Sequence, residues 1–210
     1  MNNAISKLGK TTFIVVALVA PLLAQDQVQS NRVPDAKGPE VSVSAGYSFL
    51  SMAVPGASRT NINGFDANGT MDFMSRLGAT LDFNYGRAGN ILGTSHSAYL
   101  ISVLAGPVFY PFEHGGSRFF LRGLGGVGLV NGVAPESPVD FRYGWATSPA
   151  FALGGGVEEA IGGPFALRFS GDYLRTKFFN FAGTMVPQNN YRATVGIVFP
   201  SNKWRTQPSH

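Results

Sequence analysis

The stretch that most constrains the fold is residues 190–199, because apolar residues occupy every second position there. The intervening positions hold Arg192, Thr194, Gly196 and Val198. Alternate residues of a β-strand point to opposite faces, so the pattern predicts a strand with one apolar and one largely polar face. Its length matches the about 9–11 residues of a tilted strand that crosses a bilayer. It ends at the aromatic Phe199, before Pro200, which cannot donate a ladder hydrogen bond.

Seven earlier stretches show related alternation, and loops or turns rich in Gly, Pro, Asn and Ser separate them. The eight predicted strands are residues 41–49, 65–72, 77–85, 98–106, 119–129, 151–158, 165–173 and 190–199. Their connections alternate between long and short, as in outer-membrane barrels with long external loops and short periplasmic turns. The sequence therefore predicts an all-β fold, an eight-stranded antiparallel up-and-down transmembrane β-barrel with both termini in the periplasm.

Three details of this assignment are less regular. The fourth stretch is apolar on both faces, and the pair Gly106 and Pro107 predicts a bulge or a strand end there. Residues 131–147 are predicted as the longest loop, and residues 177–189 as another. Within the longest loop the aromatic residues Phe141, Tyr143 and Trp145 alternate, which favours strands that continue outward as a hairpin.

The low charge content indicates which face of the barrel meets lipid. Only 13% of the residues are charged, against about 25% in typical soluble domains. A single lysine, Lys177, lies between Val41 and Phe199, and it is predicted to lie in a loop. A soluble barrel, such as a lipocalin-like carrier, needs a charged exterior. The pattern therefore favours an apolar face toward lipid and a polar interior, with the soluble carrier as the alternative.

The first 24 residues have the layout of a secretory signal peptide. Lys7 and Lys10 precede an apolar run, residues 11–23, and cleavage is expected after Ala24. The run is shorter than the about 20 residues of a membrane helix, so an uncleaved anchor is the weaker interpretation. Without the two lysines the chain keeps 14 basic and 12 acidic residues. No basic run remains, which argues against a nucleic-acid partner.

The remaining segments complete the predicted organisation. Residues 25–39 form a flexible lead, residues 40–199 the barrel, and residues 200–210 a polar C-terminal tail. The expected location is the bacterial outer membrane, as an integral protein exported through the cleaved signal peptide.

These features together resemble the small OmpA-like outer-membrane β-barrel proteins. The C-terminal motif that carries the resemblance consists of Gln188, Asn189, Asn190, Tyr191, Arg192, Gly196, Ile197, Val198 and Phe199. Residues 154–156 and the set Arg168, Asp172 and Tyr173 are similar to the sixth and seventh strands of that family. The resemblance implies contacts with outer-membrane lipid and with the barrel-assembly machinery. Many such barrels end at the terminal aromatic residue, whereas this chain continues to His210, and no periplasmic peptidoglycan-binding domain is expected.

Strand parity predicts a network of charged side chains in the lumen. Its members are Asp66, Asp72, Asp82, Arg122, Glu158, Arg168, Asp172 and Arg192. Charges in a narrow interior must be paired or hydrated. Glu158 and Arg168 lie on neighbouring strands joined by a short turn, so they are expected to pair. The favoured interpretation is a structural plug of ion pairs, and the alternative is a gated conducting path.

No motif in the sequence predicts catalysis, a metal site or a cofactor. Residues 123–128 match the GxGxxG spacing, but they continue a strand pattern instead of opening a helix. Lipid A-modifying enzymes exist on related barrels, yet His96 and its neighbours Ser95 and Ser97 would point to opposite sides of a strand. The chain is therefore predicted to be a structural or surface-interaction barrel and not an enzyme. A narrow porin is the alternative, and any external ligand of the loops is unspecified.

Overall fold

The computed structural model describes residues 39–54, 58–91, 96–137, 140–179 and 185–199, without the side chains of residues 133–144, 179 and 185. The predicted signal peptide, nearly all of the predicted lead and the predicted tail lie outside these residues. The strands are β1 (Glu40–Met52), β2 (Thr60–Met74), β3 (Leu77–Ala88), β4 (Ala98–Phe109), β5 (Glu113–His114), β6 (Ser117–Ser137), β7 (Asp140–Gly162), β8 (Phe165–Phe179) and β9 (Met185–Phe199). Among the described residues, no helix is long and apolar enough to cross a membrane.

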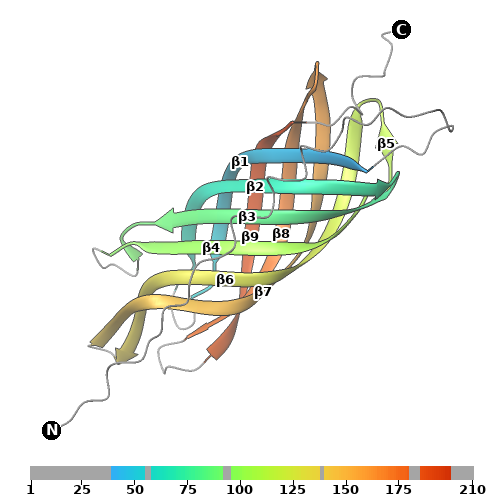
Figure 1. Ribbon diagram of the computed structural model, residues 1–210. Helices are drawn as coiled ribbons and strands as arrows, with labels where there is room; N and C mark the ends of the chain where they lie inside the picture. The colour runs from blue at the N-terminus through green and yellow to red at the C-terminus, as the bar shows by residue number, and fades with distance from the viewer. Residues whose placement is uncertain (1–38, 55–57, 92–95, 138–139, 180–184, 200–210) are drawn as a thin grey trace, which may run out of the picture. The chain divides into compact units, whose positions relative to one another are not determined.

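Eight of these strands close into a barrel in which every neighbouring pair is antiparallel. β1 pairs with β9 at one seam and β4 with β6 at another, while the two-residue β5 belongs to the turn before β6 (Figure 1). The seam between β1 and β9 aligns Tyr47 with Val195. The predicted eight-stranded antiparallel barrel is confirmed, and the stretch from which it was inferred does pair with the first strand.

Two predicted loops are wrong because the strands continue through them. β6 and β7 pair up to Ser137 and Asp140, with one register shift after Pro135, so most of residues 131–147 is a hairpin and not a loop. β8 and β9 likewise pair up to Phe179 and Met185, which places Lys177 in a strand. These ladders continue without a third strand because alternate residues of the two hairpin strands exchange N–H and C=O hydrogen bonds with each other. The predicted outward extension of the two strands is confirmed.

The predicted bulge or strand end at Pro107 is also wrong. β4 continues to Phe109 and pairs with β3 without a register shift, with Pro107 opposite Ala79. On the other side the pairing to β6 skips Gly106 and Pro107 and resumes in the same register. Proline lacks an N–H donor, so it interrupts the ladder on one side only, and the strand remains straight enough to continue.

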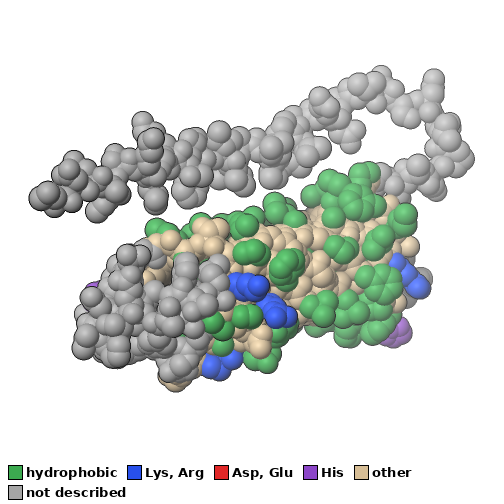
Figure 2. Space-filling model, turned by 90° about the horizontal axis from the view of Figure 1, so that it is seen from below, with side chains coloured by type: hydrophobic (Ala, Val, Ile, Leu, Met, Phe, Trp, Pro, Cys, Tyr) green, Lys and Arg blue, Asp and Glu red, His purple; other side chains and the backbone are tan. Residues whose placement is uncertain are grey.

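The barrel exterior is apolar, as the alternation predicts. Outward positions hold exposed Val, Leu, Ile and Phe side chains, with Leu153 69% and Phe151 61% exposed. Figure 2 shows hydrophobic side chains gathered over one side of the barrel, with no Asp or Glu in view. Aromatic side chains pair across strands, as for Tyr173 and Tyr191, whose ring centroids are 6.0 Å apart. An exterior of this kind is suited to lipid.

Candidate functional site

The charged side chains inside the barrel come from six different strands. Each occupies one of the alternate strand positions that point inward. The structure places all eight side chains of the predicted network inside the barrel, each 6% exposed or less. They come from β2, β3, β6, β7, β8 and β9. They do not form one cluster: a central group lies around Arg192, and two smaller groups lie nearer the end with the short turns.

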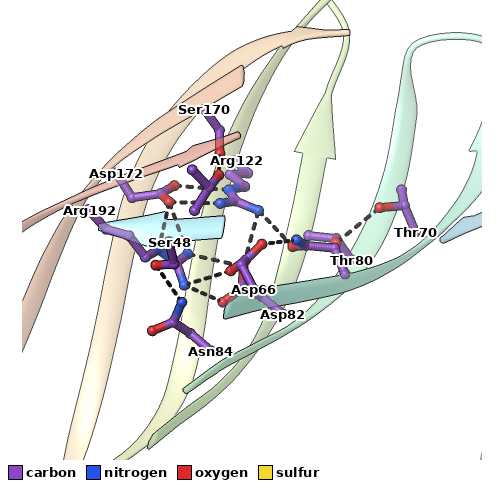
Figure 3. A network of polar contacts seen from close by, with 12 residues as sticks. Ser48, Asp66, Thr70, Thr80, Asp82, Asn84, Arg122, Ser170, Asp172 and Arg192 are labelled. Carbon is purple, nitrogen blue, oxygen red and sulfur yellow. Dashed lines mark hydrogen bonds and ion pairs between the residues drawn. The ribbon is translucent and has the colours of Figure 1, made fainter. Parts of the chain in front are cut away.

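Arg192 lies at the centre of the main group (Figure 3). Its Nη1 and Nη2 donate to the two carboxylate oxygens of Asp82 at 2.7 and 3.0 Å. Its Nε donates to Asp172 at 3.0 Å, and Nη1 also reaches Asp66 at 3.3 Å. A single guanidinium therefore binds carboxylates from three strands. Its planar arrangement of N–H donors allows the two-point hydrogen bonding to a carboxylate that is seen with Asp82.

Arg122 of β6 contacts two of the same carboxylates (Figure 3). Its Nε and Nη2 donate to Asp172 at 2.9 and 2.7 Å, and Nη1 donates to the side-chain oxygen of Asn68 at 2.9 Å. Nη1 also lies 3.2 Å from Asp82. Asn68 in turn donates to Asp66, so every acid of the group has a donor.

This central group holds two guanidinium groups and three carboxylates, all from side chains that are nearly or fully shielded from solvent. An unpaired charge there would be costly, since the surrounding wall has a low dielectric constant. Each carboxylate instead contacts an arginine. The group therefore connects strands that are far apart in the sequence through ion pairs. Its two arginines and three aspartates include no nucleophile beside a base.

A second group at the short-turn end includes three residues that the sequence did not single out, Arg118, Glu113 and Tyr110. Arg118 of β6 contacts Asp72 at 3.0 Å and Glu113 at 2.7 Å, and its guanidinium lies 3.2 Å from the ring centroid of Tyr110. Burial raises the pKa of the Tyr110 hydroxyl above its ordinary value, so this residue stays neutral. Extending the parity of the fifth predicted strand by one residue, from Phe119 to Arg118, would have found this arginine.

The third group is the pair predicted from the short turn between β7 and β8. Glu158 and Arg168 are opposite each other in the register. Arg168 Nη1 lies 3.0 Å from Glu158 Oε1, and both side chains are buried. The guanidinium also stacks over Phe120, 4.1 Å from its ring centroid. The pair therefore combines a charge-assisted hydrogen bond with a cation–π contact.

We expect Arg168→Met to lower the stability of the barrel by about 3 kcal/mol, because Glu158 is left buried without its cation. Arg175→Met is the matched control: Arg175 lies on the same strand, but it is exposed on the outer face. Urea unfolding in detergent micelles measures both variants. The double variant Glu158→Gln with Arg168→Met should recover part of the loss. Equal losses for the two single variants would contradict the burial of the pair.

The outer part of the interior is apolar, which the sequence analysis did not predict. An apolar cluster fills the half of the barrel toward the long connections; its buried members are Leu50, Met52, Ile62, Ala88, Ile91, Ala98, Leu100, Leu104, Leu124, Ala150, Ala152, Leu174 and Phe178. All but Ile91 lie at inward positions of strands. The apolar residues on both faces of the fourth predicted strand were the available signal for this layer. The expectation of a lumen filled by polar and charged side chains is thus incomplete.

The described residues contain no cluster of His, Cys, Asp or Glu that could hold a metal ion. His96 is exposed beyond the end of β3, and its carbonyl accepts a hydrogen bond from the Ile91 amide at 3.1 Å. The neighbouring Ser97 accepts a hydrogen bond from Arg87 at 3.1 Å. Residues 123–128 lie within β6, as the strand pattern at the GxGxxG spacing indicated.

Comparison with known proteins gives matches among solved structures. No protein-family model matches the chain, and neither does any curated protein sequence. Neisserial surface protein A, NspA, superposes with a TM-score of 0.60 at 13% identity, covering 79% of this chain and 100% of that one. Ail, the attachment invasion locus protein of Yersinia pestis, gives 0.55 at 20% identity, covering 78% and 99%.

These neighbours are outer-membrane barrels with eight strands, so the resemblance drawn from the sequence is confirmed at the level of the fold. Together with the apolar exterior, they support a location in the bacterial outer membrane. Removal of a signal peptide stays a prediction. The chain therefore has the fold of the small eight-stranded outer-membrane β-barrel proteins.

Proposed function

We propose that the protein is a sealed outer-membrane barrel that acts at the cell surface through its long hairpins, and that it is neither an open channel nor an enzyme. The observation that carries this proposal is the filled interior. The apolar cluster occupies the outer half, and the two arginines and three aspartates of the central group occupy the middle. An eight-stranded barrel is just wide enough for side chains to fill it.

The hairpins supply the surface that such a barrel would use. The last pair between β4 and β6 joins Tyr99 and Asn131, yet β6 continues to Ser137. Six further residues at about 3.4 Å each extend the hairpin about 20 Å past the edge of β4. Trp145 at the base of the hairpin is 56% exposed, and exposed aromatic side chains often mark contact sites.

The names of the structural neighbours are consistent with this proposal, although the similarity by itself shows only the fold. One is called a surface protein, and the other an attachment invasion locus protein that also has a structure in complex with the heparin analogue sucrose octasulfate. A role in surface contact is therefore the function that we assign to this chain.

We expect the purified protein to give no steady conductance in planar lipid bilayers, because the buried arginines and aspartates of the central group connect strands across the lumen. An open porin inserted from the same detergent serves as the control for incorporation. Heat-modifiable migration on a gel shows that the inserted sample is folded. Steady conductance of large ions by the folded protein would overturn the sealed-barrel proposal and favour the narrow porin.

The proposed role of the β6–β7 hairpin in surface contact is tested on intact cells. Residues 133–143 are replaced by Asn-Gly, a sequence suited to a two-residue hairpin turn, between Gly132 and Gly144, which face each other. We expect the shortened protein to fold but to lose adhesion of expressing cells to surfaces coated with matrix protein or sulfated glycan. The full-length variant Phe141→Ser with Tyr143→Ser asks whether the aromatic residues carry the contact. Unchanged adhesion of the shortened variant would contradict the proposed role of the hairpin in surface contact.

A further inference from the structure

The exposed charged side chains described at the outer end of the barrel are all basic. Four basic side chains, Arg59, Arg87, Arg175 and Lys177, are exposed near the ends of strands that lead to the long connections. We call them the cationic rim. Among the described side chains, the carboxylates exposed on the exterior belong to Glu113 and Glu159, beside the short turns at the opposite end. The rim therefore has no exposed acid among the described side chains to neutralise it.

Two members of the rim lie close together over the strands β8, β9 and β1. Arg59 donates from Nε to the Ser51 hydroxyl at 2.8 Å and from Nη2 to the Asn189 carbonyl at 3.2 Å. Its guanidinium lies 5.0 Å from the ring centroid of Tyr191. Arg175 is the register partner of the same Asn189. The two arginines thus flank one residue of β9, and Arg59 is held in place by contacts that leave its charge unpaired by any described carboxylate.

An apolar groove lies farther along the same strands, and the pair Tyr173 and Tyr191 separates it from the arginines. It has a volume of about 930 Å³ and crosses the outer face of β9, β8 and β7. Its floor is made of Ala193, Gly171 and Gly155, which are opposite each other in the register. One end is lined by Phe49 of β1, two residues before the Ser51 that Arg59 contacts, and the other by Phe112 in the turn before β6. The groove therefore runs obliquely from the rim end toward the short-turn end.

We propose that the cationic rim and this groove together bind one outer-leaflet lipid that carries a phosphate headgroup. The phosphate lies between Arg59 and Arg175, with Lys177 on the same strand as Arg175, and one acyl chain lies in the groove over Gly171. Guanidinium groups bind phosphate through paired hydrogen bonds. Tyr173 and Tyr191 lie just below the arginines, and tyrosine belts sit at the headgroup level of a membrane.

The juxtaposition of the two features selects a lipid over other occupants. A free anion would use the arginines but not the apolar groove, while an uncharged acyl chain would use the groove but not the arginines. A lipid with a phosphate headgroup uses both at once, and the groove is on the surface that faces the bilayer. Basic residues beside membrane-spanning segments are a known means of recognising anionic headgroups.

The test uses native mass spectrometry of the detergent-solubilised protein with lipid A that carries two phosphates. We expect Arg59→Gln with Arg175→Gln to weaken binding about tenfold or more, since two charge-assisted contacts are lost. Arg87→Gln is the control, because Arg87 belongs to the rim but lies on β3, over Tyr99 and away from the groove. Equal effects of the double variant and of Arg87→Gln would overturn the proposal.

The groove is tested separately with a pair of glycines. A side chain at Gly171 would enter open space, with nothing within 4 Å of its Cβ, and the same is true of the outward-facing Gly69 on β2. Gly171→Leu should fill the groove and weaken lipid A binding, whereas Gly69→Leu should leave it unchanged. Equal binding by these two variants would overturn the acyl-chain assignment. Full competition by inorganic phosphate would also overturn it and indicate an anion site instead.

Discussion

Replacing Arg192 by Met is expected to destabilise the barrel by about 3–5 kcal/mol, the cost typical of removing one partner from a buried ion pair. This arginine contacts Asp82, Asp172 and Asp66, which belong to three different strands. Without it, Asp82 and Asp172 share the single guanidinium of Arg122, and Asp66 keeps the hydrogen bond from Asn68 but no arginine. Total stabilities of folded domains are about 5–15 kcal/mol, so the loss is a large fraction of the whole. Urea unfolding in detergent micelles, followed by tryptophan fluorescence, measures it.

The control and the rescue variant separate charge from packing. Arg175→Met removes an exposed arginine of the outer face and is expected to change stability by less than about 1 kcal/mol. Adding Asp82→Asn to Arg192→Met removes one of the uncompensated carboxylates and should restore part of the loss. If the double variant is as unstable as the single one, the lost packing of the long Arg192 side chain, and not its charge, determines the effect.

The second large effect is expected at Gly46, where the first and last strands meet. Gly46 and Gly196 are opposite each other in the seam between β1 and β9. A Cβ built on Gly46 would lie 2.1 Å from the Val195 carbonyl oxygen and 2.4 Å from the Gly196 Cα. Backbone atoms cannot move aside as a flexible side chain can. Gly46→Val should therefore separate the two strands and destabilise the barrel by about 3 kcal/mol, the upper end of the cost that is typical of overpacking.

Heat-modifiable migration after refolding into micelles provides the measurement. Gly46→Val should give little or none of the folded, faster-migrating form. Gly69→Val is the matched control, because its added side chain meets nothing within 4 Å and valine favours strands. A folded fraction for Gly46→Val equal to that of Gly69→Val would show that the seam tolerates a side chain at this position.

The contrast between these two glycines is explained by the face on which each lies. Gly46 is at an inward position, where strand coiling brings a neighbouring backbone over the Cα. Gly69 faces outward, and the same curvature opens space there. Glycine in a strand often marks a close approach of another backbone, and at the seam Gly46 and Gly196 bring two backbones together in this way.

The sequence alone determined the barrel, its strand faces and the inward position of eight charges. It could do so because a period of two fixes the face of every residue in a strand, independently of what the strand packs against. The same rule also places Arg118 inward. This arginine was missed only because the fifth predicted strand began at Phe119, one residue too late. Alternation also indicated that Phe141, Tyr143 and Trp145 extend two strands outward.

Only the tertiary structure decided which inward residues meet. Arg192 and Asp82 are 110 residues apart, and their contact depends on the shear and closure of the whole sheet, which no local pattern encodes. The same closure stacks apolar inward residues of β1, β2, β3, β4, β6, β7 and β8 into the outer layer. It also bends the wall so that Gly155, Gly171 and Ala193 form a groove. Parity fixes the direction of a side chain, but its partners are set by how far each strand is shifted along the next.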